Sequence, residues 1–301
     1  MMSRLLKYAG ITLGAIVLLL VVGVAALYAW SGAEIGRRKT LPTHPFVAPT
    51  DSAAIARGEH ITRALTKCGD CHGADFGGGA VVDDPAIGFI YAPNLTKGRG
   101  GIGDQLTDAA FEVAVRHGLG RDGHRILIMP SPEYQNLSDD DLGMVVAFLH
   151  SVPPVDREAP PTKVGPLARG LYAAGILPLF PGDAVTHVDG VVASVPVDST
   201  VAYGRYLGSV GCAGCHGTTY GGGAIPGGPP EWPKPANLTP TGIGHYSFEG
   251  FDRALHEGVR PDGTKIDPFM PVHATKLMTD VEIVAVWKYL RTLPPKEFGA
   301  R

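Results

Sequence analysis

The sequence is poor in cysteine, in basic charge and in catalytic motifs, and each shortage excludes a class of protein. Four cysteines in 301 residues are too few for a disulfide scaffold, which belongs to shorter secreted chains. No Ser-His-Asp, paired-carboxylate or phosphate-binding constellation stands out, so bond-breaking catalysis is not indicated. The formal net charge is −3, and residues 41–301 carry 21 basic against 28 acidic side chains, a net charge of −7. An acidic surface of this kind disfavours binding to nucleic acid.

Glycine and proline, in contrast, are abundant, with 41 and 26 residues. Such a composition approaches the range of disordered chains. However, 45% of the residues are apolar and the net charge is small, which favours a folded, loop-rich protein. A domain of this type often depends on a non-peptide group in its core.

The N-terminal segment has the length of a membrane span. Tyr8 to Trp30 are 23 uncharged, mostly aliphatic residues that follow Arg4 and Lys7. About 20 apolar residues cross a bilayer, whereas the apolar part of a secretory signal has only about 7 to 15. Tyr28 and Trp30 form the aromatic pair expected at the far interface. We therefore expect an uncleaved signal-anchor helix, with a cleaved signal as the alternative.

The rest of the chain consists of two copies of one domain of about 100 residues. "CGDCHGADFGGGA" at 68–80 matches "CAGCHGTTYGGGA" at 212–224, and "PNLT" at 93–96 matches "ANLT" at 236–239. The later elements recur in the same order, which is the mark of an internal repeat. We expect an N-terminal transmembrane helix in 1–40, domain 1 in 41–155, a semi-rigid Pro-rich linker in 156–197 and domain 2 in 198–301.

Each copy is expected to begin and end with a helix. Asp51 or Thr50 is a suitable N-cap for the first helix of copy one, and Asp198 for that of copy two. The closing helices follow Ser138 and Thr279 and end at Pro-Pro pairs, because proline breaks helices. A short helix is also expected in the linker, at about 167–176. Strand-like alternation is scarce, so the predicted fold class is all-α: two tandem domains with long Gly/Pro-rich loops.

The two C-x-x-C-H motifs allow three interpretations. A structural zinc site needs four ligands from two well-separated pairs, and this would leave the histidines unexplained. A redox dithiol usually begins a helix after a strand, in a context that is missing here. Covalent attachment of c-type haem needs two thiols separated by two residues, followed by a histidine as the proximal iron ligand. The motif residues are Cys68, Cys71 and His72 in copy one and Cys212, Cys215 and His216 in copy two. The duplicated motif on an exported chain favours two covalently bound haem c groups.

The sixth iron ligands are predicted to be methionines. Met129 and Met270 occupy equivalent positions, and each is followed by proline. Met144 and Met278 do not align with one another, so packing is a sufficient explanation for them. Histidine is the chief rival ligand, but the remaining candidates have no counterpart in the other copy and are expected to be satisfied by other contacts. These are His117, His124, His150, His256 and His273.

With these features, residues 50–298 resemble two class I cytochrome c domains. In that family the N-terminal helix crosses the C-terminal helix at a contact between a glycine and an aromatic residue. Gly58 with Phe148, and Gly204 with Tyr289, stand at the matching places. The tandem arrangement is similar to the cytochrome c subunits of bacterial membrane-bound dehydrogenases. Some of those subunits carry three haems, whereas this chain has attachment motifs for two.

The resemblance implies a membrane-anchored dihaem cytochrome c that transfers single electrons and is not itself an enzyme. The donor would be a dehydrogenase or a respiratory or photosynthetic complex, and the acceptor a protein such as a terminal oxidase. Haem is attached outside the bacterial cytoplasmic membrane, so we expect a single-pass protein with its N-terminus inside and its haem domains in the periplasm. Its partners would be the membrane and redox proteins or a multisubunit complex. The alternative is a dihaem peroxidase-like enzyme, in which one iron has an open position.

Overall fold

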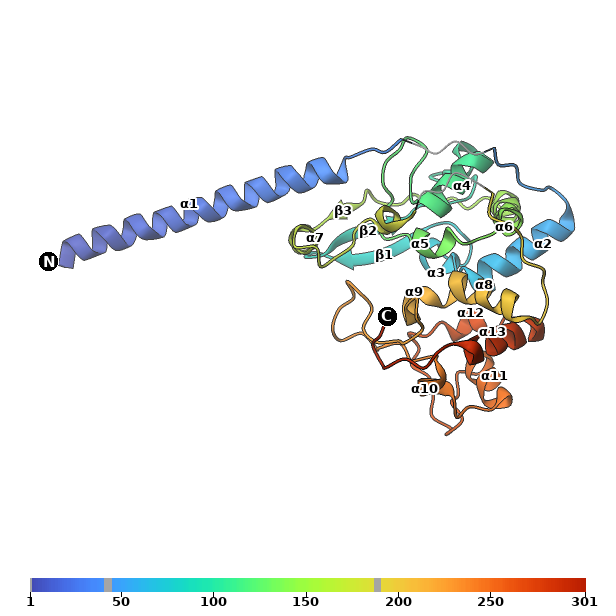
Figure 1. Ribbon diagram of the computed structural model, residues 1–301. Helices are drawn as coiled ribbons and strands as arrows, with labels where there is room; N and C mark the ends of the chain where they lie inside the picture. Colours follow the sequence, from blue (N-terminus) through green and yellow to red (C-terminus); the bar gives the residue numbers. More distant parts are fainter. Residues whose placement is uncertain (1, 41–44, 187–190) are drawn as a thin grey trace.

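The computed structural model describes residues 2–40, 45–186 and 191–301. A long helix, α1 (Met2–Ile35), projects from a globular part in which the first repeat lies against the second (Figure 1). Within α1, Leu6–Ile35 reaches a mean hydropathy of 2.7, and none of its most apolar stretch is buried in the protein. The helix is thus a candidate membrane span, in agreement with the length of its apolar sequence.

Helices are the main regular secondary structure of both repeats. The first repeat contains α2 (Ser52–His60), the π-helical turn η1 (Ile61–Leu65), α3 (Gly69–His72), β1 (Gly79–Asp84), β2 (Gly88–Ala92), the 3₁₀ turn η2 (Gly103–Gln105), α4 (Asp108–His117), α5 (Ser131–Tyr134) and α6 (Asp139–Ser151). The second contains α8 (Val201–Gly211), α9 (Ala213–His216), α10 (Pro240–Ile243), α11 (Phe248–His256), α12 (Val272–Thr275) and α13 (Asp280–Thr292). Between the repeats lie β3 (Lys163–Val164), α7 (Pro166–Ala173) and the 3₁₀ turn η3 (Pro181–Ala184).

The first and last helices of each repeat cross at a glycine. A Cβ atom on Gly58 of α2 would lie 1.8 Å from a main-chain oxygen of α6 and 3.0 Å from the Cβ of Phe148. A Cβ atom on Gly204 of α8 would lie 1.9 Å from a main-chain oxygen of α13 and 2.8 Å from the Cβ of Tyr289. Real Cβ atoms do not approach so closely, so only glycine permits these crossings. The expected glycine–aromatic contacts are therefore confirmed in both repeats.

Most helix starts agree with the capping signals in the sequence. Asp51 caps α2 by accepting a hydrogen bond from the main chain of the third helical residue at 2.9 Å. Thr279 and Glu282 form a complete capping box at α13. The cap of α8 was wrongly assigned to Asp198, because Thr200 fills that position and Asp198 instead accepts from the Thr200 N–H at 2.9 Å. Asp198 thus shapes the turn that precedes the helix.

The first repeat departs from the all-α expectation. Strands β1 and β2 form an antiparallel hairpin, and β3 extends it through the pairs Gly88–Val164 and Phe89–Lys163 (Figure 1). The sequence of β1, "GAVVDD", lacks the alternation of a half-buried strand, so the sequence pattern did not predict this strand. No strand lies at the corresponding place, 225–235, of the second repeat, where prolines remove the N–H donors that a sheet needs. These prolines are Pro226, Pro229, Pro230, Pro233 and Pro235.

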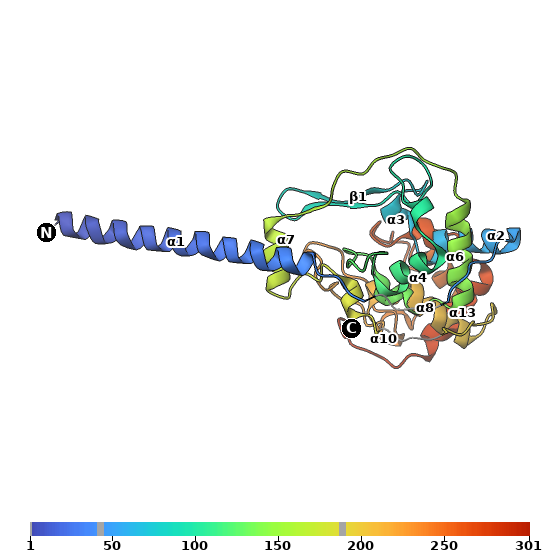
Figure 2. The same cartoon turned by 90° about the horizontal axis from the view of Figure 1, so that it is seen from above.

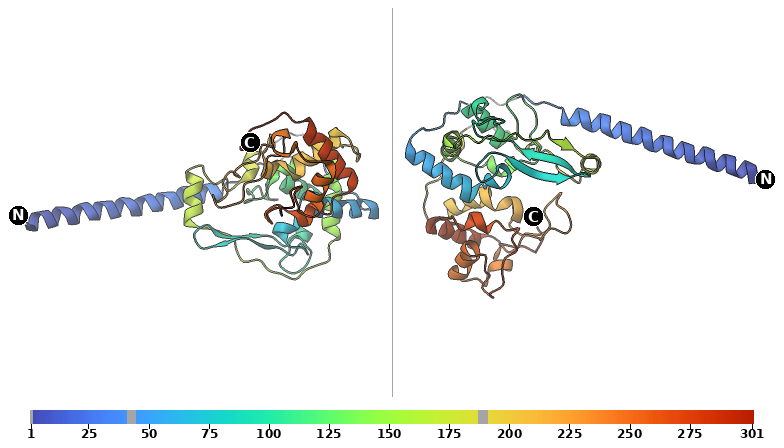
Figure 3. Two further views of the ribbon diagram at one scale, coloured as in Figure 1. Left: turned by 90° about the horizontal axis from the view of Figure 1, so that it is seen from below. Right: turned by 180° about the vertical axis from the view of Figure 1, so that it is seen from behind.

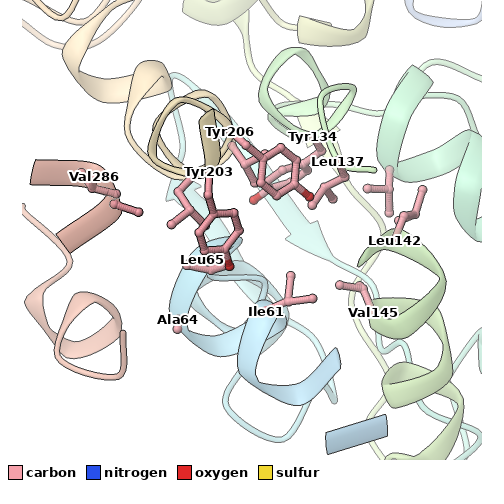
Figure 4. Packing of buried hydrophobic residues seen from close by; sticks show 14 of the residues in the cluster. Ile61, Ala64, Leu65, Tyr134, Leu137, Leu142, Val145, Tyr203, Tyr206 and Val286 are labelled. Carbon is pink, nitrogen blue, oxygen red and sulfur yellow. The ribbon is translucent and has the colours of Figure 1, made fainter. Parts of the chain in front are cut away.

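Both repeats contribute to one hydrophobic core. Ile61, Leu142 and Val145 of the first repeat belong to the same buried cluster as Tyr203 and Val286 of the second (Figure 4). Helix α8 runs along the boundary, where it contacts η1 and α5 of the first repeat as well as α13 of its own (Figure 3). The two repeats therefore pack against each other through a shared core.

A buried carboxylate joins the repeats across this boundary. Glu282 of α13 is fully buried and accepts hydrogen bonds from Arg57 at 2.9 Å and from His60 at 2.8 Å, both on α2. Tyr203 also contacts it, at 3.3 Å. Burial alone would raise the pKa of Glu282, but the hydrogen bonds from His60, Arg57 and the Thr279 main chain lower it to about 2.

We predict that Gly204→Ala destabilises the fold by about 1–3 kcal/mol or more, because its methyl group overlaps the carbonyl oxygen of α13. Gly170→Ala is the matched control, since a Cβ at this helical glycine meets nothing within 4 Å. It should be neutral or stabilising, by up to about 1 kcal/mol. Urea unfolding followed by circular dichroism measures both, and equal stabilities would contradict the crossing.

We predict that Glu282→Gln lowers the free energy of unfolding by about 3 kcal/mol at neutral pH, from a pKa near 2 in the folded state against 4.5 when unfolded. A depressed carboxyl pKa stabilises the fold above pH 4.5, and the effect is lost as the pH falls towards 2. The difference between wild type and variant should therefore shrink over this range in urea titrations. Exposed Glu257 provides the control Glu257→Gln, which should change little at any pH. A gap that is independent of pH would refute this role of Glu282.

Candidate functional site

The two C-x-x-C-H motifs form one-turn helices directly after the first helix of each repeat. Helix α3 carries Cys71 and His72, with Cys68 at its N-cap, and α9 repeats this arrangement in the second copy. One helical turn brings residues i and i+3 to the same side, so both thiols of a motif face one way. Each helix ends at a glycine with positive φ, +80° at Gly73 and +81° at Gly217. This conformation, which favours glycine, turns the chain away immediately after the histidine.

Each motif histidine is oriented by a main-chain carbonyl. His72 Nδ1 donates to the Pro93 oxygen at 2.9 Å, and His216 Nδ1 donates to the Ala236 oxygen at 2.7 Å. Because a carbonyl only accepts, Nδ1 must carry the hydrogen, which leaves the lone pair on Nε2. Burial lowers the pKa of both imidazoles, so the neutral, ligating form is favoured. This is the usual arrangement of a histidine that binds a metal through Nε2.

The repeated "GGGA" and "NLT" sequences hold these carbonyls in place. Gly78 and Gly222 have positive φ and lie against the main chain at 92–94 and 235–236. Asn94 donates from its side chain to the Val155 oxygen at 2.7 Å, and Asn237 does the same to the Lys296 oxygen. "NLT" is thus a structural loop in both repeats. The sequence did not predict that the main-chain oxygens of Pro93 and Ala236 bind the motif histidines. The duplicated "NLT" was the only sign that this part of the chain is structurally important.

The state of the thiols bears on the alternatives to haem. Burial raises the pKa of Cys68 and Cys71, and it raises that of Cys212 to about 11. A reactive dithiol uses a thiolate, which a raised pKa disfavours. Across 2–40, 45–186 and 191–301, no group of three or more His, Cys, Asp or Glu side chains is arranged to hold a metal ion. The buried thiols thus disfavour a reactive dithiol.

Both predicted methionine ligands lie just before a short helix. Met129 precedes α5, is partly buried and packs against the same core as Cys68. Met270 precedes α12 and is also partly buried. Met144 and Met278 pack against the core, as expected for structural residues. Ligation by Met129 and Met270 stays a prediction.

The rival histidines have other partners. His150 contacts Asp108 at 2.8 Å, and His256 contacts Asp252 at 3.0 Å. The other three likewise lie against carboxylates: His117 near Glu112, His124 beside Asp122 and His273 beside Asp70. All five are thus satisfied by neighbouring groups.

Three contacts bring the two motifs together across the boundary between the repeats. Lys67, next to Cys68, donates to the Leu65 oxygen at 2.9 Å and to the Gly211 oxygen, next to the second motif, at 3.0 Å. His273 of α12 lies 2.8 Å from Asp70, inside the first motif. In return, the carboxylate of Glu133 on α5 accepts from the main chain of Gly214, inside the second motif. Each repeat therefore supports the motif of the other.

Comparison with known proteins agrees with this geometry. The sequence model of the family described as "Cytochrome C oxidase, cbb3-type, subunit III" matches residues 53–149, and that of "Cytochrome c" matches residues 201–294. The chain is 32% identical to the cytochrome c subunit of the quinone alcohol dehydrogenase of Gluconobacter oxydans, over 81% of this chain and 55% of that protein. It is 28% identical to the fructose dehydrogenase cytochrome subunit of Gluconobacter japonicus, over 85% and 56%.

The chain spans a little over half the length of these curated relatives. The two family matches together extend over more than half of the chain and coincide with the two repeats. Each match includes a C-x-x-C-H motif whose histidine is oriented by a carbonyl. The chain therefore belongs to the c-type cytochromes, with one cytochrome c domain in each repeat.

Proposed function

We propose that the chain is a membrane-anchored dihaem cytochrome that relays single electrons from a dehydrogenase to a downstream acceptor such as a terminal oxidase. The observation that carries this is the duplicated histidine geometry, with each Nδ1 bonded to a carbonyl at an equivalent position. Two sites of the same kind in one rigid body fit a relay. The similarity to cytochrome subunits of dehydrogenases supports a place in such a membrane complex.

The residues of each repeat fit a covalently bound haem c. Cys68 and Cys71, and in the second repeat Cys212 and Cys215, would form the thioether bonds. His72 with Met129, and His216 with Met270, would be the axial ligands. When bound, each haem supplies an iron that is reversibly oxidised and reduced by one electron. The chain's own part is to present a neutral Nε2, to exclude water and to hold the two motifs side by side.

The contacts at the boundary between the repeats set the distance between the two sites. Lys67 bonds to main-chain oxygens next to both motifs, so the motifs cannot separate without breaking these bonds. The shared core and the buried Glu282 make the boundary rigid. A short, fixed separation favours electron exchange within the chain over exchange with solvent species.

The proposed location is the bacterial cytoplasmic membrane, with the N-terminus inside and both haem domains in the periplasm. Helix α1 would be the anchor, and the division into 1–40, 41–155, 156–197 and 198–301 remains our proposal for the units. The dihaem peroxidase alternative requires one iron with a displaceable ligand. The matched positions of Met129 and Met270 disfavour it.

The full chain, expressed in a bacterium that attaches haem c and purified from its membranes, tests this function. We expect two haem c groups per chain by pyridine haemochrome assay, low-spin spectra, and a dehydrogenase subunit that co-purifies. Reduction by the dehydrogenase and its substrate should then load two electrons per chain. Turnover of hydrogen peroxide together with one high-spin haem would instead establish the peroxidase.

We predict that Met270→Leu retains both haems but lowers one midpoint potential. Methionine ligation raises haem potentials, and axial ligands span a range of about 0.8 V. The affected haem should also bind added imidazole. Met278→Leu is the matched control, because Met278 packs against the core and should leave both potentials unchanged. Spectroelectrochemical titration decides, and unchanged potentials in Met270→Leu would exclude it as a ligand.

We predict that Lys67→Met lowers both midpoint potentials together. The ammonium group bonds next to both motifs, and a nearby positive charge favours the reduced state of each. Lys265→Met removes the same charge from an exposed position of the second repeat and serves as the control. A shift of only one potential, or equal shifts in the control, would contradict a location of Lys67 between the sites.

A further inference from the structure

The segment from Val164 to Gly182 is apolar, yet the proposed electron relay does not use it. Its 19 residues, "VGPLARGLYAAGILPLFPG", contain one charged side chain, Arg169. Leu167 and Ile176 are 49% and 58% exposed. Two large aliphatic side chains of this short, nearly uncharged segment are thus exposed to solvent.

Helix α7 of this segment packs against the globular end of the candidate membrane helix α1. Tyr172 stacks on Trp30 with ring centroids 5.7 Å apart. Arg169 donates to the Ser31 hydroxyl at 2.7 Å, and its guanidinium lies 4.8 Å from the centre of the Tyr28 ring. Aromatic residues at the end of a membrane span lie at the level of the lipid headgroups. Helix α7 therefore lies at that same level.

The direction of α7 fits this level. Helix α1 runs across the page in both Figure 1 and Figure 2, whereas α7 is seen end-on in the first and from its side in the second. Helix α7 thus runs across the direction of α1 and not alongside it. If α1 crosses the bilayer, α7 lies flat along its surface, which is how interfacial helices bind.

The segment is also held firmly in this place. Ala168, Leu179 and Phe180 form a small second core, against which Ile35 of α1 packs. Beside it, buried Arg125 donates to Asp183 at 2.7 Å, and its guanidinium lies 3.9 Å from the centre of the Phe180 ring. The apolar surface is thus part of an ordered structure. Binding to a bilayer would therefore cost little conformational entropy.

We infer that residues 166–177 form a second membrane contact, which inserts Leu167 and Ile176 into the boundary between headgroups and acyl chains. Arg169 lies beside Tyr28 at the same level, where lipid phosphates are available to its charge. The occupant is lipid rather than a protein, because the surface continues directly from the aromatic end of the span. This inference rests on the proposed membrane anchoring by α1. It fixes the first haem domain against the membrane surface, so that the domain does not swing freely on its anchor.

Lipid photolabelling of the full, haem-loaded chain tests the inference. Proteoliposomes of phosphatidylcholine and phosphatidylglycerol would contain a phosphatidylcholine with a diazirine near the start of one acyl chain. After illumination, mass spectrometry of the digested protein locates the label. We expect label in α1 and also in 166–177. Leu277 and Val281, with similar exposures of 45% and 41%, lie in the second repeat and provide the internal control that should stay unlabelled.

Two variants complete the test. Leu167→Glu with Ile176→Glu should lose most of the label in 166–177 and keep that in α1, because carboxylates are expelled from this depth. Leu277→Glu, the matched control, should change neither. Label in α1 alone in the wild type would overturn the second contact and leave the anchor intact. Label in neither segment would overturn the anchor as well. Protection of 166–177 only when a co-purified subunit is present would assign the surface to a protein and also refute the inference.

Discussion

Each repeat depends on one close approach between two backbones. Where α2 crosses α6, and α8 crosses α13, the main chains come so near that no side chain fits at Gly58 or Gly204. The C-x-x-C-H motif follows the first helix of each pair almost directly, so the crossing sets where cysteines and histidine lie. A loop-rich chain with so much glycine and proline has few other rigid elements. The two crossings therefore provide the frame on which both sites are built.

The two repeats are joined by contacts that lie at equivalent places in each repeat but involve different chemical groups. A short helix on the methionine side of one repeat contacts the cysteine motif of the other: α12 through His273 to Asp70, and α5 through Glu133 to Gly214. One contact pairs an imidazole with a carboxylate, and the other pairs a carboxylate with a main-chain N–H. Because each repeat contacts the motif of the other, the two sites form one structural unit and are not independent domains joined by a linker.

Local signals in the sequence predicted what depends on neighbouring residues. The repeats, most helix caps and the spacing of thiols and imidazole were all readable in this way, whereas the two crossing glycines were expected from the resemblance to class I cytochrome c domains. Other features depend on partners far along the chain, such as the carbonyl of Pro93, 21 residues after His72, or Glu282, 225 residues after Arg57. A main-chain carbonyl also carries no residue signature. The hairpin was missed because "GAVVDD" lacks alternation and gains its order from pairing with β2.

The two predicted methionine ligands are held by different means. Before Met129, Ile128 has a φ of +64°, a strained conformation for a β-branched residue that costs on the order of 1–3 kcal/mol. The N–H of Ile128 donates to the Leu179 oxygen at 3.0 Å. This bond holds the strained residue against the small core that packs on α1. Met270 is instead set by a local turn at Asp267. With identical ligands proposed for both irons, differences in potential must arise from their surroundings. The segment that holds Leu179 is thus one feature, beside the β1–β2 hairpin, that distinguishes the first site from the second.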